Sequence, residues 1–212
     1  MKLKRKKLDF NKQKERKCIF EIFKQLTPHP PSNKIKRPLE SGNTKIGVSG
    51  IFFDVTYVWN LPPFVTCPGA SLWCQTHCYN FDLRSDIYNI DMWCENWWSA
   101  IYEPNKLELD IINQLTEYKD KAIAVRFHSS GDFFSKDYIN MWINICKQLK
   151  HIHFWGYTRS WAVSELSELI NELSSLENVS LYASVDPSMG KNPNQKMSIT
   201  VDTYSELSAY FN

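Results

Sequence analysis

Segments of strand length alternate with segments of helical periodicity along most of this 212-residue chain. Short apolar runs predict strands at residues 52–59, 122–127, 152–157, 179–184 and 198–201. Apolar residues with helical spacing predict helices at residues 85–102, with Ser85 as N-cap, and at 107–119, 136–149 and 163–176. This alternation is typical of a parallel sheet with right-handed crossovers. The prediction is an α/β fold, either an open parallel sheet of four to five strands or a partial (β/α) barrel.

Polar segments follow the first four predicted strands. A cysteine-containing loop follows the first strand, and residues 128–132, 158–161 and 184–186 follow the next three. The carboxyl ends of parallel strands lie along one edge of a sheet, and ligands bind at that edge in α/β proteins. We therefore expect these four segments to meet in space and to form one site.

The small net charge of +2 conceals two unlike parts of the chain. Residues 1–40 hold 13 Lys and Arg against 4 Asp and Glu, a net of +9, whereas residues 41–212 hold 12 against 19, a net of −7. We predict a basic N-terminal arm at 1–40, with a helix over 8–26 and then a proline-rich linker, and an α/β metal-binding domain at 41–212. The arm is either a solvated tail or a surface that attracts the phosphate backbone of nucleic acid.

The expected compartment sets how the six cysteines are interpreted. The charged start of the chain is not followed by an apolar signal segment, and no apolar stretch approaches the roughly 20 residues of a membrane span. We therefore expect a cytoplasmic protein without a membrane partner. Stable disulfides are rare in the cytoplasm, so clustered cysteines there indicate metal ligands or catalysts.

Cys67, Cys74 and Cys78 fall within twelve residues, a density that favours a soft metal. Zinc in a closed structural site would need a fourth ligand, for which His77, Cys94 and His128 are candidates. A [4Fe–4S] cluster held by three cysteines would leave one iron open for a substrate or cofactor. The spacing alone does not choose between iron and zinc, and three reduced core cysteines are the remaining alternative. Cys18 and Cys146 are interpreted as ordinary thiols.

Three further residues are candidates for catalysis. Asp132 can hydrogen-bond a ribose or an amine, or else cap the helix that begins near Lys136. Arg159 can grip a carboxylate or phosphate bidentately, or else form a surface ion pair. His128 is a ligand or a hydrogen-bonding histidine. Ser184 and Asp186, after the fourth strand, are candidate cofactor contacts.

A His-hydrophobe-His pattern at His151 and His153 offers a different interpretation. On a strand, alternation would put both imidazoles on one face, as in the metal site of rolling-circle replication endonucleases. Those enzymes use antiparallel sheets, and no tyrosine followed by a suitably spaced lysine occurs downstream. The parallel α/β pattern therefore disfavours this interpretation.

Taken together, several motifs over residues 43–190 resemble the bacteriophage gene product 88 family. They are Thr44-Lys-Ile-Gly47, Trp59-Asn-Leu-Pro62, Thr66-Cys-Pro-Gly69, Cys74, Cys78-Tyr79, Arg126-Phe-His128, Ser130-Gly-Asp-Phe-Phe134 and Tyr157-Thr-Arg-Ser-Trp161. The resemblance implies a phage or mobile-element origin and thus the host cytoplasm.

That family in turn is similar to radical S-adenosylmethionine (SAM) proteins. This similarity implies a radical-SAM-like partial barrel. By this analogy Cys67, Cys74 and Cys78 bind a [4Fe–4S] cluster, and Ser130, Gly131 and Asp132 contact the amine of SAM. The spacing here, C-x6-C-x3-C, differs from the usual C-x3-C-x2-C of those enzymes.

Two functions follow as expectations. The first is an iron–sulfur protein acting as a radical-SAM-like enzyme on a substrate, small or macromolecular, that the sequence does not identify. The alternative is a non-enzymatic protein, stabilised by zinc or a cluster, that binds nucleic acid through residues 1–40 in replication or host takeover.

Overall fold

The computed structural model describes residues 20–32, 37–42, 53–78, 80, 87–117, 120–190 and 196–201 of the chain. Predictions for residues 1–19 (Cys18 among them), for residues 44–47, for Tyr79 and for the cap Ser85 lie outside these ranges. The elements in chain order are β1 (Glu40–Ser41), β2 (Val55–Trp59), α2 (Leu72–Thr76), α3 (Ile87–Tyr102), α4 (Pro104–Thr116), β3 (Ile123–Phe127), α5 (Lys136–Gln148), β4 (His153–Thr158), the 3-10 helix η2 (Ser160–Ala162), α6 (Ser164–Ser174), β5 (Val179–Val185) and β6 (Met197–Ile199).

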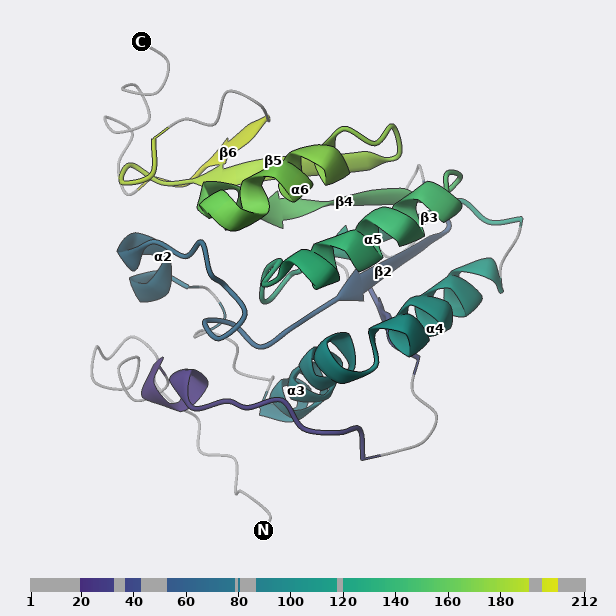
Figure 1. Cartoon of the computed structure of the whole chain (residues 1–212), viewed down its shortest axis with the longest axis horizontal. Coiled ribbons are helices and arrows are strands. Elements are labelled where there is room, and N and C mark those ends of the chain that lie inside the picture. Colours follow the sequence, from purple (N-terminus) through teal and green to yellow (C-terminus); the bar gives the residue numbers. More distant parts are fainter. Residues whose placement is uncertain are drawn as a thin grey trace.

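The six strands form one open sheet in the order β1-β2-β3-β4-β5-β6. Strands β2 to β6 pair in parallel, which confirms the predicted α/β class, and β1 adds an antiparallel edge. The sheet therefore has one strand more than the predicted four to five. The additional strand, β1, has two residues and is too short to show any periodicity. Each strand lies beside its neighbour in the sequence, so successive crossovers fall on one side, and helices α3 to α6 form a single layer there (Figure 1).

Side chains alternate between the two faces of the sheet, as strand geometry requires. The face beneath the helices is apolar and buried, and it carries Ile123, Val125, Phe127, Phe154, Val179 and Leu181. The alternate positions of the central strands carry Arg126, Trp155, Tyr157 and Tyr182, which are half-buried or exposed. The sheet therefore has one dry face and one face that offers polar and aromatic side chains.

Aromatic rings fill the core beneath the carboxyl ends of the central strands. The ring of Phe127 lies 5.1 Å from that of Trp142 and 5.7 Å from that of Phe154, and Trp59 meets Trp142 at 6.2 Å. These side chains are fully buried. Because they pack edge-on and in stacks at these distances, they form a rigid floor under the loops that follow β2, β3 and β4.

Helix boundaries follow from local capping. Ser135 accepts a hydrogen bond from the backbone of Tyr138 at 3.3 Å and so begins α5. The alternative role for Asp132, that of capping this helix, is therefore wrong. Pro104 occupies the first turn of α4, where its missing N–H costs nothing.

The second half of the basic arm packs on the domain. Phe23 is buried, and its ring lies 6.1 Å from that of Phe64, in the loop after β2. Leu39 exchanges two backbone hydrogen bonds of 2.9 Å with the amide of Gln114 in α4. The backbone and hydroxyl of Ser32 both donate to Glu95 in α3. The described part of the arm is thus held by specific contacts.

The structure also bears on the predicted histidine pair and on membrane spans. His151 lies in a turn before β4, so it does not share a strand face with His153, and the His-hydrophobe-His metal pair is wrong. No helix among the described ranges has both the length and the apolar character to cross a membrane.

Candidate functional site

A cavity of about 400 Å³ opens at the carboxyl edge of the sheet. Its wall includes nine of the ten residues proposed from sequence: Cys67, Cys74, Cys78, His128, Ser130, Gly131, Asp132, Arg159 and Ser184. The expected convergence of four separate loops is therefore confirmed. Asp186 is the exception, because its carboxylate lies against Arg159 behind the wall. In Figure 1, α2 lies beside the arrowheads of β4 and β5, at the left of the molecule.

The cysteine loop is shaped by its own backbone. Cys67 donates to the carbonyl of Phe64 at 3.1 Å and accepts from Ala70 at 3.1 Å, and Ser71 then caps α2 by accepting from Cys74 at 3.0 Å. Gly69 lets the loop touch the next segment, since a Cβ there would lie 2.1 Å from the carbonyl oxygen of Arg159. Only glycine allows this approach.

The three cysteine thiols line the cavity without forming a disulfide. Burial raises the pKa of Cys67 well above its usual range, and nearby Asp132, Cys78 and Cys74 raise it further. Burial also raises the pKa of Cys74, although the guanidinium of Arg159 acts in the opposite direction. Because the pKa values of Cys67 and Cys74 are raised, a bound cation would favour their thiolate forms.

The donor chemistry at this loop fits a soft metal or an iron–sulfur cluster. Among the described ranges, however, no three His, Cys, Asp or Glu side chains stand ready-gathered around one metal position. Of the candidate fourth ligands, His77 and His128 line the cavity, and Cys94 does not. Cys94 is buried in α3 instead.

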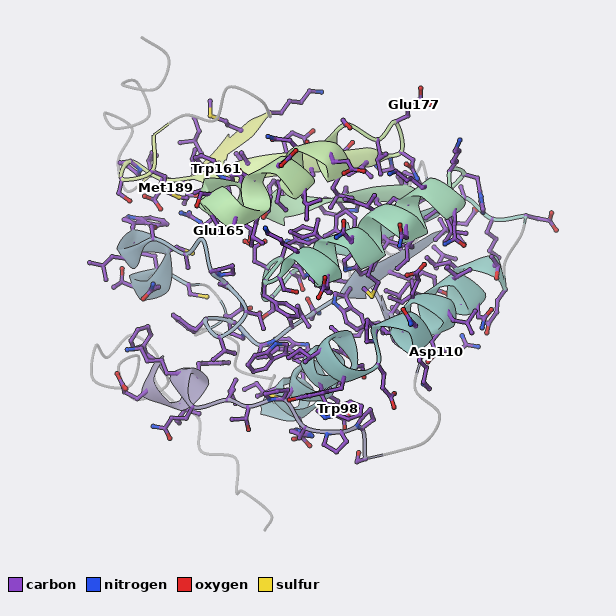
Figure 2. The ribbon with its side chains drawn as sticks, in the orientation of Figure 1. Trp98, Asp110, Trp161, Glu165, Glu177 and Met189 are labelled. Atoms are coloured by element: carbon purple, nitrogen blue, oxygen red, sulfur yellow. The ribbon has the colours of Figure 1, made fainter. Side chains whose placement is uncertain are left out.

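A buried ion pair ties the cysteine loop to the segments that follow β4 and β5 at the same edge of the sheet. Nη1 of Arg159, which follows β4, donates to Oδ2 of Asp186, which follows β5, and the same carboxylate accepts from the hydroxyl of Ser71. Nη1 also contacts the sulfur of Met189 at 2.7 Å, and Figure 2 labels Met189 where the chain leaves β5. The predicted alternative of a surface ion pair for Arg159 is therefore wrong, because both side chains are buried.

Hydrogen bonds to Asp186 set its charge state. Burial favours the neutral carboxyl, but bonds from Ser188, Ser71 and Arg159 together lower its pKa below the ordinary value. Asp186 is therefore the anionic partner that keeps the Arg159 charge compensated.

Asp132 joins the loop after β3 to the end of β4. Its Oδ1 accepts from the hydroxyl of Thr158 at 2.6 Å and from the backbone of Phe133 at 2.8 Å, and its Oδ2 accepts from the backbone of Arg159 at 2.8 Å. Burial raises its pKa, while these bonds act in the opposite direction. The carboxylate of Asp132 thus holds together two of the segments that line the cavity. Gly131 precedes it with φ of 80°, where a Cβ would meet Leu61 at 2.5 Å.

His128 is a buried, neutral histidine. Its Nε2 lies 2.7 Å from the hydroxyl of Tyr138, whereas its Nδ1 is buried without a partner among the described residues. Burial, with a further contribution from the charge of Arg126, lowers its pKa to about 3. His128 therefore cannot act as a cation near neutral pH, and it offers the cavity an uncharged imidazole.

Arg126 is the wall residue that the sequence reasoning missed as a site candidate. It lies in the middle of β3, between apolar residues that face the helices, and its side chain lines the cavity. Its Cζ lies 5.1 Å from the ring centre of Trp155, in a cation–π contact. A charged residue inside an otherwise apolar strand of a parallel sheet was the signal that could have identified it.

Comparison with known proteins places these features in a family. The sequence pattern described as gene product 88 matches residues 32–206. A Gene 88 protein of Mycobacterium phage D29 is 27% identical over 132 residues, and one of Mycobacterium phage L5 is 24% identical over 130 residues. Each alignment covers 58% of this chain and 52% or 53% of the relative, so the chain spans about half the length of these curated relatives. No solved structure matches the chain.

Proposed function

The chain belongs to the bacteriophage gene product 88 family, and from that premise we propose that it is an iron–sulfur protein. Cys67, Cys74 and Cys78 would hold a [4Fe–4S] cluster at the carboxyl edge of the sheet. When bound in this way, the cluster would have one iron without a cysteine ligand and could supply an electron, taken from an external reductant, for the reductive cleavage of SAM. The protein would then be a radical-SAM-like enzyme.

One observation carries the proposal. Three thiols from one short loop line a single cavity. They lie close enough together that Cys74 and Cys78 both raise the pKa of Cys67. Soft thiolate ligands favour zinc, copper(I) or iron–sulfur clusters over hard cations. A cavity of about 400 Å³ beside the loop is larger than a closed structural zinc site needs, which favours a cofactor that leaves a coordination position open.

The surrounding residues would keep the loop in place and leave room for a ligand. The ion pair of Arg159 and Asp186 holds the start of α2 through Ser71. Asp132 orders the segment at the end of β4, and Ser130 and Gly131 lie on the wall where a SAM amine contact is proposed. These chain groups bind and orient, while the cofactor supplies the redox chemistry.

Metal and sulfide analysis of anaerobically purified full-length protein tests the proposal. We expect a brown protein that contains iron and acid-labile sulfide, and we expect Cys67→Ser, Cys74→Ser and Cys78→Ser each to lower both. Cys94→Ser is the matched control, because this thiol is buried in α3 away from the cavity. A colourless protein with one zinc per chain would overturn the proposal. SAM cleavage after chemical reduction separates an enzyme from a structural cluster.

The charge of the arm favours a second function. Residues 1–40 carry a net charge of +9, which suits nucleic-acid binding without base specificity. In that case the metal would be zinc or a cluster with a structural task, and the arm would provide the affinity.

A further inference from the structure

The structure describes three arginines, and one of them has no anionic partner. Arg37 pairs with Glu117 at 3.0 Å, and Arg159 pairs with Asp186. Within the described ranges no carboxylate or carbonyl accepts from Arg126, and its Nε is buried without a partner. A half-buried guanidinium without a counter-charge is costly in a folded protein unless something binds it. The position of this charge therefore indicates a ligand.

Arg126 stands where a ligand can reach it. It alternates along β3 with the core residues Val125 and Phe127, so it belongs to the face of the sheet opposite the helix layer, and it lines the cavity together with His128 and the cysteine loop. Trp155, its register partner on the neighbouring strand, has its ring centre 5.1 Å from Cζ of Arg126. A guanidinium carries several N–H donors in one plane, which suits the two-point recognition of a carboxylate or phosphate.

A second unsatisfied polar atom lies two residues further along. Nδ1 of His128 is buried without a described partner, and the residue itself is only 5% exposed. Nε2 of the same ring lies 2.7 Å from the hydroxyl of Tyr138, which is itself buried. We take the tautomer in which the Tyr138 hydroxyl donates to Nε2 and the proton of the neutral ring resides on Nδ1. Nδ1 is then a hydrogen-bond donor with nothing to bind.

The same wall also offers an exposed aromatic ring. Tyr157 lines the cavity and is 40% exposed, and its ring lies 5.8 Å from that of Tyr182 on the next strand. Trp155 meets Tyr157 at 6.3 Å, so the guanidinium and the exposed ring belong to one continuous row of aromatic contacts. Exposed aromatic rings on a sheet face are suited to stacking against a nucleobase.

We propose that this wall binds a nucleoside monophosphate, either free or as the terminal unit of a nucleic acid. The phosphate would accept from Arg126 and from Nδ1–H of His128, and the base would stack on Tyr157. A cavity of about 400 Å³ lies within the range of small-ligand pockets and has room for one nucleotide. The inference names a ligand class for the same cavity as the proposed cluster, but it does not require the cluster.

Calorimetric titration of full-length protein with AMP, adenosine and inorganic phosphate tests the inference. We expect AMP to bind more tightly than adenosine by roughly tenfold to a hundredfold, the range for a charge-assisted contact. Arg126→Gln should abolish this difference, and Arg126→Lys should retain part of it. Arg37→Gln, which removes a surface arginine, should leave it unchanged. Equal binding of AMP and adenosine, or equal effects of Arg126→Gln and Arg37→Gln, would overturn the inference.

A second variant tests the stacking surface and guards against misfolding. Tyr157→Ala removes an exposed ring and should weaken AMP and adenosine alike, whereas unchanged binding of both would remove Tyr157 from the site. Circular dichroism, iron and sulfide are measured on every variant. Normal iron with no AMP binding would refute the nucleotide site and leave the cluster proposal standing. AMP binding in a protein without iron would support the nucleotide site and refute the cluster proposal.

Discussion

The guanidinium of Arg159 is ion-paired with the carboxylate of Asp186, and both side chains are almost fully withdrawn from solvent. The two residues follow neighbouring parallel strands, β4 and β5. The carboxylate also accepts from Ser71, the residue that caps α2 in the cysteine loop. One buried pair therefore fixes the mutual position of three of the loops that form the cavity.

Asp186→Asn should destabilise the fold strongly, because it leaves the Arg159 charge buried without a partner. Removal of one member of a buried pair costs about 3–5 kcal/mol of the free energy of unfolding. Urea denaturation measures the loss. The matched control is Glu172→Gln, which breaks the surface pair with Lys147 and should cost about 1 kcal/mol or less. Similar small losses in both variants would contradict the importance of the buried pair.

His128 should make stability fall as the solution is acidified. Its pKa is about 3 in the folded protein and ordinarily 6.5, so below pH 6.5 the unfolded chain gains a proton that the folded chain does not. Stability is lost from about pH 6.5 down to about pH 3, and the loss is about 2 kcal/mol at pH 5. His128→Gln keeps an acceptor for Tyr138 and should remove this part of the difference between urea denaturation curves at pH 7 and pH 5. His151→Gln, at an exposed histidine, is the control. A difference that persists in His128→Gln would show that His128 is not the cause.

Gly69→Ala should displace the cysteine loop. The added Cβ would lie 2.1 Å from the Arg159 carbonyl oxygen, a backbone atom that cannot move aside cheaply. We expect loss of iron and sulfide together with a lowered free energy of unfolding. Gly190→Ala is the comparison, since no atom lies within 4 Å of its Cβ position and only its positive φ disfavours alanine, at about 1 kcal/mol. Full iron content in Gly69→Ala would contradict the close packing of this loop.

Deletion of residues 1–19 separates the fold from nucleic-acid binding. The contacts of the arm with the domain that the structure describes involve residues from Phe20 onward, so the free energy of unfolding should change little. The deleted segment carries 9 of the 13 Lys and Arg of the arm, and its loss should weaken binding of single-stranded DNA most at low salt. Fluorescence polarisation at two salt concentrations measures this. Unchanged affinity would refute a nucleic-acid role for the arm.

The sequence predicted the central strands well because their burial is legible in single residues. Residues 122–127 were predicted as a strand, and β3 covers Ile123–Phe127 with every second side chain in the core. A helix was predicted at residues 107–119, whereas α4 begins three residues earlier, at Pro104. β1 arises from pairing with β2 and has no local signal of its own. The five-residue α2 depends on the Ser71 cap.

For the site, topology was predictable and pairing was not. The strand order brought Cys67, Asp132 and Arg159 to one edge, as expected from the alternation alone. The ion pair between Arg159 and Asp186 could not be predicted, because it depends on side-chain directions that sequence spacing does not reveal. Arg126 was hidden within a strand, where its importance comes from the absence of a described partner.

The hydrogen bond from Ser71 to Asp186 spans 115 residues of sequence, and this has a consequence for synthesis. The ribosome releases the cysteine loop long before it releases β5. While α3 to α6 are synthesised, the nascent loop therefore lacks its hydrogen bond to Asp186. A cluster delivered early would meet three cysteines on an open loop, whereas one delivered late would have to enter the cavity of the folded protein. For the proposed cluster, the order in which cofactor and carboxyl-terminal strands arrive would therefore decide whether the loop is loaded before or after its contact with Asp186 forms.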